Sequence, residues 1–274
     1  MDFVDANGIR FAYLSEGSGP LVLLLHGFPD TPYTWERVMP EVARAGYRAV
    51  APFMRGYHPT SIPKDGKYDG DTLGRDVLAL IEALGEQQAI VVGHDWGALA
   101  AYTAAAVGPE RVRALITVGV PHPRSVLPTP RVLWTVRHFF VLRNKGAAHK
   151  IRAKNHAYID QLVRRWSPAW KDMPADETAR VKQAFAEPGC LEAACSYYAA
   201  LTPFMPASLR ASIKVPSVAF AGIHDNMSPR VYEKARRCFV GSYEVVQVPG
   251  GHFMHREHPN EFTAELTRVL RAAG

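Results

Sequence analysis

Long apolar runs and cysteine are scarce in this sequence, and each scarcity excludes a class of protein. The most apolar run, Leu21 to Leu25, is far shorter than the roughly 20 residues needed to cross a bilayer, so no membrane span is expected. The first ten residues, MDFVDANGIR, have neither a basic n-region nor an apolar h-region, so we expect no secretion signal. The three cysteines are odd in number and show no C-x-x-C spacing, which argues against a disulfide framework and a zinc site. A cytoplasmic protein without a bound metal is therefore expected.

The net charge of +6 is unevenly distributed along the chain. Between Arg124 and Lys171 there are eleven lysines or arginines and one acid, Asp160. Such a segment can steer anionic ligands, but more often it is the solvated face of helices. No nucleic-acid-binding motif accompanies the charge, so a nucleic-acid partner is not expected.

Strand-length apolar runs alternate with helical spacing over the first 120 residues. For the helix predicted at 71–85, Asp71 is the expected N-cap and Gly85 the expected end. A buried strand followed each time by a helix predicts a mostly parallel sheet with right-handed crossovers. The predicted strands are 9–17, 20–28, 47–53, 88–94 and 112–120, and the predicted helices are 33–47, 71–85 and 96–108.

The alternation stops after residue 120, where four prolines occur within 121–130. From there to Pro206 the patterns are helical, and strands are predicted again at 215–223 and 242–250. The sequence thus predicts an α/β core over residues 1–122 and 207–274, with a helical insert over 123–206. The helices expected in this part of the chain are 131–142, 149–166, 176–186, 230–239 and 259–273.

Residues 91–100, VVGHDWGALA, combine the end of a strand, a tight turn and the start of a helix. Asp95 stands in the turn between Gly93 and Gly97, which allow close backbone approach. Ligands of open α/β sheets bind beyond the carboxyl ends of the strands. Asp95 is therefore a candidate nucleophile, and the alternative interpretation is a plain helix cap.

A carboxylate that attacks carbon forms an ester, and a histidine oriented by a second acid can activate the water that hydrolyses this ester. The chain order for this sheet type is nucleophile, acid, histidine. Asp225 in FAGIHDNMSP and His252 in QVPGGHFMHREHP each follow a predicted strand. His255 and His258 are rival candidates for the base, but they lie further into the loop and its helix.

The segment His26-Gly27-Phe28-Pro29 follows a predicted strand and supplies another part of the site. The backbone N–H groups of Phe28 and Trp96 are predicted to form an oxyanion hole. The Phe28–Pro29 bond is a candidate for the cis form.

Five motifs together resemble the epoxide hydrolase branch of the α/β-hydrolase superfamily: HGFPDT, RGY at 55–57, GHDWG, GIHDNMSP and GGHFMHREHP. The resemblance covers the predicted core, about 190 residues. It implies an α/β-hydrolase fold, a helical cap over the site, and no metal or organic cofactor. It also implies that Asp95 opens an epoxide through a covalent ester, which water activated by His252 and Asp225 hydrolyses to a vicinal diol.

Epoxide hydrolases of this type place two tyrosines in the cap as donors to the epoxide oxygen. The segment ACSYYAAL resembles the second tyrosine motif, with Tyr198 as the donor and Tyr197 as the alternate; either can instead serve helix packing. The first motif is aromatic in the family, but LWTVRHFFVL has no tyrosine. His138 is the nearest donor there, and some relatives use histidine in this role.

Haloalkane and haloacetate dehalogenases share the aspartate turn and are the alternative prediction. Trp96 and Trp134 would then donate their indole N–H groups to a halide. Haloalkane dehalogenases usually carry Asn at the position of Phe28, and haloacetate dehalogenases carry Arg at that of Trp96. A non-catalytic small-ligand sensor is less favoured, because Asp95, Asp225 and His252 are all present. The expected substrates are a small or medium apolar epoxide and water, and both monomer and homodimer stay open.

Overall fold

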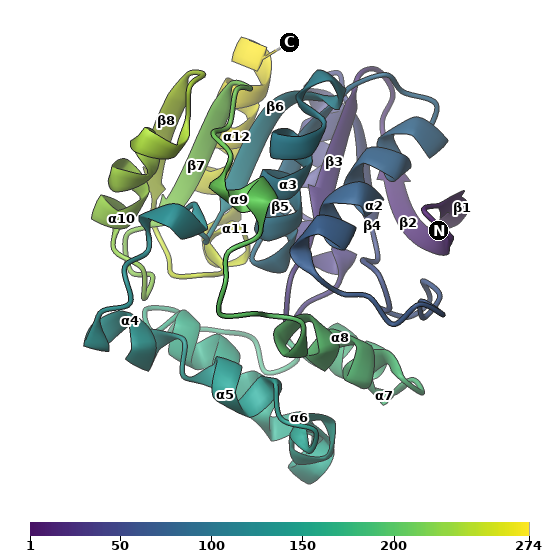
Figure 1. Ribbon diagram of the computed structural model, residues 1–274, viewed down its shortest axis with the longest axis vertical. Coiled ribbons are helices and arrows are strands. Elements are labelled where there is room, and N and C mark those ends of the chain that lie inside the picture. Colours follow the sequence, from purple (N-terminus) through teal and green to yellow (C-terminus); the bar gives the residue numbers. More distant parts are fainter. Residues whose placement is uncertain (274) are drawn as a thin grey trace.

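A single eight-stranded sheet forms the centre of the computed structural model, which describes residues 1–273 (Figure 1). The strand order is β1-β2-β4-β3-β5-β6-β7-β8. All pairings from β3 to β8 are parallel, whereas β1 and β2 run antiparallel to their neighbours. The predicted mostly parallel sheet is confirmed. The strands are β1 (Asp2–Ala6), β2 (Ile9–Glu16), β3 (Leu21–Leu25), β4 (Arg48–Pro52), β5 (Ala89–His94), β6 (Val112–Val118), β7 (Ser217–Gly222) and β8 (Tyr243–Val248).

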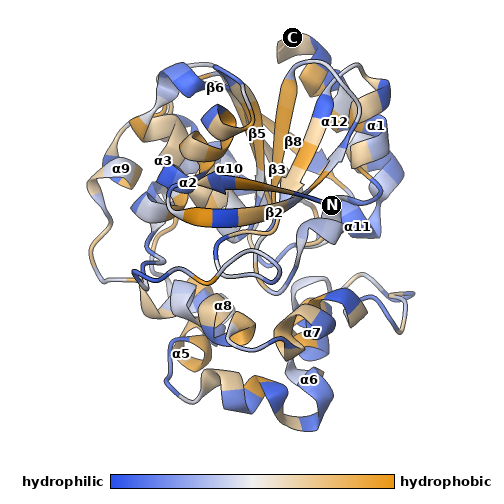
Figure 2. Cartoon of the chain, turned by 90° about the vertical axis from the view of Figure 1, so that its right-hand side faces the viewer, coloured by the Kyte–Doolittle hydropathy of each residue, from blue (hydrophilic) through white to orange (hydrophobic). Residues whose placement is uncertain are grey.

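The central strands are apolar throughout because both faces of the sheet are covered by helices. Every residue of β3 and β5 is buried. Along β3, Leu23 packs into the core on one face and Leu24 into the core on the other, as the alternation of side chains in a strand requires. Figure 2 shows the apolar strands at the centre and more polar residues on the outward sides of the helices.

The two faces of the sheet are covered by different helices. Residues of α2 and α3 belong to one buried core, and residues of α1 and α12 belong to the other. These and the other core helices are α1 (Met39–Arg44), α2 (Gly70–Ala83), α3 (Trp96–Val107), α9 (Ala207–Arg210), α10 (Pro229–Lys234), α11 (Met254–Glu257) and α12 (Pro259–Ala273).

Residues 123–206, here called the cap, contain only helices among their regular elements. They form a layer beyond one end of the sheet (Figure 1). Within α6, residues Lys154 to His156 have positive φ and break the helix. The cap helices are α4 (Pro130–Thr135), α5 (His138–Leu142), α6 (Ala147–Trp166), α7 (Ala179–Ala186) and α8 (Cys190–Ala199).

The structure corrects several predicted element boundaries. The helix predicted at 33–47 is a 3-10 turn over Pro32–Trp35 followed by α1. The prediction of Asp71 as an N-cap is wrong, because Asp69 accepts the Thr72 N–H at 2.9 Å and α2 begins at Gly70. Asp71 lies inside the first turn and instead accepts a hydrogen bond from the Ser208 hydroxyl.

Further elements differ from the sequence analysis, among them the helix predicted at 131–142, which is α4 followed by α5. The edge strand β1 and the cap helix α8 were not predicted. The helix predicted at 230–239 is α10 followed by a 3-10 turn over Ala235–Cys238. None of the helices within residues 1–273 combines the length and apolar composition that crossing a bilayer requires.

Candidate active site

Asp95 lies in a sharp turn between the end of β5 and the start of α3. Its backbone angles are φ 53° and ψ −116°, a conformation that non-glycine residues rarely adopt and that costs about 1–3 kcal/mol. Close packing holds the turn: a Cβ on Gly97 would lie 2.4 Å from the Leu25 carbonyl oxygen, and one on Gly93 would lie 2.2 Å from the Gly97 oxygen. The turn therefore requires glycine on both sides of Asp95.

The segment after β3 closes over the Asp95 carboxylate. The Phe28 N–H donates to Oδ1 of Asp95 at 2.8 Å, and the Phe28–Pro29 bond is cis. A Cβ on Gly27 would lie 2.5 Å from this Oδ1 and 2.7 Å from the Trp96 backbone nitrogen. The two backbone groups predicted for the oxyanion hole, those of Phe28 and Trp96, are thus both close to Gly27.

His252 lies between two carboxylates. Its Nε2 is 3.5 Å from Oδ2 of Asp95, and its Nδ1 is 3.4 Å from Oδ2 of Asp225. The Asp225 side chain is only 2% exposed. Burial by itself lowers the pKa of His252, but the two carboxylates raise it to about 10. The three loops predicted to meet at the carboxyl edge of the sheet do bring these residues together.

The rival histidines have other partners. The His255 Nε2 lies 2.6 Å from the Thr34 hydroxyl, and burial holds its pKa well below the usual value. His258 is partly exposed and lies 3.8 Å from Glu261. His252 is therefore the histidine that the structure places against Asp95.

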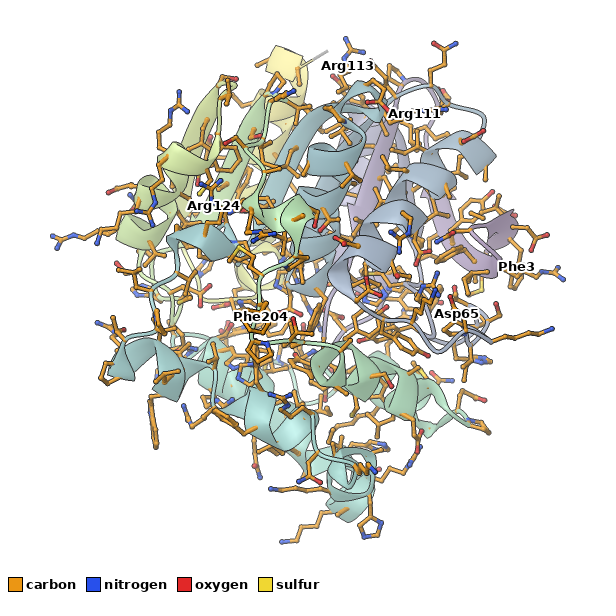
Figure 3. All side chains as sticks on the ribbon, in the orientation of Figure 1. Phe3, Asp65, Arg111, Arg113, Arg124 and Phe204 are labelled. Atoms are coloured by element: carbon orange, nitrogen blue, oxygen red, sulfur yellow. The ribbon has the colours of Figure 1, made fainter. Side chains whose placement is uncertain are left out.

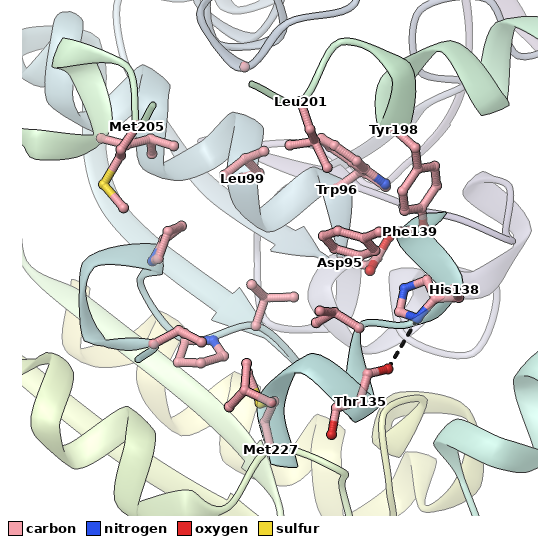
Figure 4. A pocket seen from close by; sticks show the side chains of 18 of the residues that line it. Asp95, Trp96, Leu99, Thr135, His138, Phe139, Tyr198, Leu201, Met205 and Met227 are labelled. Carbon is pink, nitrogen blue, oxygen red and sulfur yellow. Dashed lines mark hydrogen bonds between the residues drawn. The ribbon is translucent and has the colours of Figure 1, made fainter. Parts of the chain in front are cut away.

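A cavity of about 770 Å³ lies between the core and the cap, and Asp95, Asp225 and His252 all line it (Figure 4). Its walls are mainly apolar. Leu133 and Phe204 line it while remaining exposed, so they mark its mouth. Figure 3 places Phe204 on the segment that returns from the cap to the core. Apolar lining residues include Leu99, Val120, Val132, Phe139, Trp166, Leu201, Met205 and Met227.

The two tyrosines of α8 occupy different environments. Tyr198 lines the cavity, packs edge-on against Phe28 and Trp96, and has a buried hydroxyl without a hydrogen-bond acceptor. Burial raises the pKa of Tyr198 well above its usual value, so the hydroxyl keeps its proton. The Tyr197 hydroxyl instead donates to the Arg55 carbonyl at 2.8 Å. Tyr197 is not among the residues that line the cavity, so of the two tyrosines it is Tyr198 that borders it.

His138 lines the cavity, but one of its nitrogens is already engaged. Its Nδ1 lies 3.2 Å from the Thr135 carbonyl oxygen, so Nδ1 carries the proton (Figure 4). Burial lowers the pKa of His138 to about 3, which keeps the ring neutral. Its Nε2 then holds a lone pair and accepts rather than donates. Trp134 lies outside the cavity and is 69% exposed, with the Arg137 guanidinium 4.2 Å from its ring centre.

Three buried side chains near His252 could together bind a metal ion. They are Asp30, His94 and His255, and their potential ligand atoms lie within 4.8 Å of one another. Arg256 already pairs with Asp30 at 2.9 Å, so its charge opposes a second cation there. His94 uses its Nε2 to donate to the His252 carbonyl at 3.0 Å. The chemistry of these three side chains therefore favours a role in supporting the His252 loop over a role in binding a metal.

Comparison with known proteins places this geometry in a family. The family model described as alpha/beta hydrolase fold matches residues 20–259. The AB hydrolase superfamily protein YfhM of Bacillus subtilis is 32% identical, and the alignment covers 94% of this chain and 93% of that protein. An epoxide hydrolase of Caballeronia sordidicola is 31% identical, with 98% of this chain and 92% of that protein covered. The chain belongs to the epoxide hydrolase branch of the α/β-hydrolase superfamily.

Solved structures of epoxide hydrolases share the fold. The Bacillus megaterium epoxide hydrolase in complex with an inhibitor has a TM-score of 0.88 at 24% identity, covering 98% of this chain and all of that one. A putative epoxide hydrolase of Klebsiella pneumoniae has a TM-score of 0.85 at 25% identity, covering 98% of this chain and 97% of that one.

The sequence analysis did not identify the residues that contact His252 on the side away from the cavity. The His94 ring lies 4.7 Å from the His252 ring at an angle of 52°, and the end of α6 contacts the His252 backbone. The His94 position is visible in the GHDWG motif, directly before the nucleophile candidate. The α6 contact spans 86 residues and has no local sequence signal.

Proposed function

We propose that this member of the epoxide hydrolase branch converts epoxides to vicinal diols through a covalent ester on Asp95. The observation that carries the proposal is the position of the Asp95 carboxylate. One oxygen accepts the Phe28 N–H, the other faces His252, and both lie at the wall of an apolar cavity that also holds the Tyr198 hydroxyl.

In the first step Oδ2 of Asp95 attacks a ring carbon of the epoxide. The carbon–oxygen bond of the strained ring breaks, and its electron pair moves to the epoxide oxygen. Tyr198 donates its O–H proton to that oxygen, which avoids a free alkoxide in an apolar cavity. The raised pKa of Tyr198 supports this role, because the group is protonated throughout the neutral range.

In the second step water attacks the carbonyl carbon of the ester, and His252 takes the proton of that water. The developing charge falls on the oxygen held by the Phe28 N–H, with the Trp96 N–H beside it. Collapse of the intermediate breaks the ester bond and releases the diol with the proton from His252. The second proton of the water passes from the Asp95 carboxyl group to the Tyr198 phenolate, which restores both the Asp95 carboxylate and the Tyr198 hydroxyl.

Esterification prepares His252 for the second step. Two carboxylates raise its pKa to about 10 in the resting enzyme, and the ester removes the charge of one of them. The pKa of His252 then falls, so the ring becomes a free base when water must be activated. Asp225 lies 3.4 Å from Nδ1 on the far side of the ring, which orients Nε2 toward Asp95.

The hydrogen bond of His138 to Thr135 supports Tyr198 rather than His138 as the proton donor. In this arrangement the neutral His138 offers a lone pair at Nε2 to the cavity. We propose that it accepts hydrogen bonds from water or from a hydroxyl of the bound molecule. This replaces the donor role that the resemblance implied for it.

The cavity supports a small or medium apolar epoxide as substrate, since its volume of about 770 Å³ is typical of sites for such molecules. All the proposed reacting groups come from one chain, so catalysis needs no particular oligomer and both monomer and homodimer are compatible. The three cysteines are free and buried, which supports the proposed cytoplasmic location. No step of the proposed mechanism calls on a cofactor, a nucleic acid or a membrane.

The dehalogenase alternative has less support. A halide needs a pair of N–H donors, and Trp134 is exposed and does not line the cavity, which argues against it as the second donor. Phe28 offers a hydrocarbon ring where haloalkane dehalogenases carry an amide. A sensor without activity is not favoured either, because nucleophile, base and acid are all within contact distance.

Product analysis tests the proposal directly. The enzyme is incubated separately with a styrene-oxide-type epoxide, a bromoalkane and a haloacetate, and diol and halide are assayed. We expect diol from the epoxide alone; halide release without diol would establish a dehalogenase instead. The His252→Gln variant should stall after the first step, and mass spectrometry should find the added mass on a peptide containing Asp95.

A further inference from the structure

The C-terminal end of cap helix α6 contacts both loops that carry the catalytic partners of Asp95. The carbonyl of Trp166, the last residue of α6, accepts the His252 N–H at 3.0 Å. The carbonyl of Arg165 accepts from the Asn226 side chain, next to Asp225, at 3.2 Å. Such terminal carbonyls have no partner inside their own helix. Here they are satisfied by the loops that carry the base and the acid.

A pair of side chains, Ser167 and Glu257, extends this contact. The Ser167 hydroxyl donates to Oε1 of Glu257 at 2.5 Å and accepts the Phe253 N–H at 3.3 Å. The same Oε1 accepts the Gly251 N–H at 2.8 Å. Ser167 is only 1% exposed. The backbone N–H groups of residues 251, 252 and 253 are thus bound by Glu257, Trp166 and Ser167 in turn.

The fit at this point leaves little room for movement. A Cβ on Gly251 would lie 2.7 Å from the Ser167 Cα and 2.7 Å from the Trp166 carbonyl oxygen. Any side chain at position 251 would therefore separate the cap from the loop of the base. This closeness is expected where backbone, rather than side-chain packing, sets the position of a group.

We propose that Ser167 and Glu257 are positioning residues that set the imidazole of His252 against Asp95 and so couple the cap to ester hydrolysis. The inference rests on the proposed function. The His252 ring reaches its two carboxylates at 3.4 and 3.5 Å, so a small shift of its backbone moves the base out of reach of its water. Formation of the ester uses Asp95, Phe28 and Tyr198, which this pair does not contact.

The two half-reactions separate a positioning role from a structural one. In the Ser167→Ala and Glu257→Ala variants, rapid-quench kinetics should show ester formation within about twofold of wild type. Ester hydrolysis should slow by about tenfold or more, the scale expected for a misplaced catalytic group. In the steady state kcat should fall while kcat/KM, governed by ester formation, changes little. The adduct on Asp95 should accumulate.

Conservative and remote variants complete the experiment. Glu257→Gln keeps an oxygen that can accept from both Gly251 and Ser167, so it should restore most of the hydrolysis rate. The matched control is Ser196→Ala, because Ser196 is partly exposed on α8 and its hydroxyl donates to the Glu192 carbonyl of its own helix. It should leave both half-reactions unchanged.

Each remaining outcome rejects a defined part of the proposal. An equal loss of both steps in Ser167→Ala and Glu257→Ala, with no recovery in Glu257→Gln, means a purely structural role. Unchanged hydrolysis means that the pair does not position His252. If neither wild type nor His252→Gln ever forms an adduct on Asp95, the proposed function fails, and the positioning role fails with it.

Discussion

The backbone N–H of Phe28 lies 2.8 Å from Oδ1 of Asp95, and this contact makes the two oxygens of the carboxylate chemically different. In the proposed mechanism, the bonded oxygen is the one on which negative charge develops during ester hydrolysis. The other oxygen faces the cavity and His252, and it is the one free to attack carbon. A backbone contact between segments 67 residues apart thus assigns separate tasks to two atoms of one side chain.

Replacing Tyr198 by Phe should slow ester formation by about 10²- to 10⁴-fold, because the epoxide oxygen loses its proton donor. Single-turnover measurement of adduct formation on Asp95 checks this rate. Tyr197→Phe is the matched control, since it removes the same hydroxyl from the neighbouring residue. It should cost about 1 kcal/mol of folding free energy through the lost bond to the Arg55 carbonyl, with ester formation nearly unchanged. Equal rate losses in both variants would contradict the assignment.

Replacing His138 by Phe should leave most of the ester-formation rate, because the ring is neutral and its only proton is bonded to Thr135. We expect less than about a tenfold loss, below the roughly 10²- to 10⁴-fold that removing a catalytic acid costs. The rate is measured from pH 5 to 8 for wild type and variant. A loss as large as that of Tyr198→Phe would restore His138 as the first donor.

The stability of the enzyme should decrease in alkaline solution because of His252. Folding raises its pKa from 6.5 to about 10, so the stabilisation is fully present below pH 6.5 and is lost as the pH rises through about 10. Thermal unfolding of wild type between pH 6.5 and 10 should show a falling Tm. His252→Gln should show a clearly smaller decrease over the same range, and parallel curves for the two proteins would rule out the raised pKa.

Gly27→Ala should damage the site. The new Cβ would lie 2.4 Å from the Asp95 Cβ and 2.5 Å from its Oδ1, so the turn or the segment after β3 must shift. Overpacking of this kind costs about 1–3 kcal/mol of folding free energy, and we expect ester formation to fall as well. Gly146→Ala is the control, because the nearest atom to its Cβ would be 3.7 Å away. Urea unfolding and adduct kinetics measure both effects; a fully active Gly27→Ala enzyme would show that the contact is not needed.

The features predictable from sequence are those with local patterns. Buried strands such as β5 have continuous apolar runs, and Asp95, Asp225 and His252 each follow such a strand, so the sheet order brings them to one edge. The short exposed strand β1 has no such run and was missed. The Ser167–Glu257 contact joins residues 90 apart, and the proton on His138 depends on the Thr135 carbonyl, so neither has a local pattern.

The turn at Asp95 is held by backbone atoms of β3 and α3. The orientation of its carboxylate is therefore set by the core and not by the cap helices. Exchange of cap sequences between relatives should therefore change which molecules are accepted while the chemistry at the sheet edge is conserved. Such a chimaera must retain residues 165–167 of the cap, because they accept hydrogen bonds from the loops that carry His252 and Asp225.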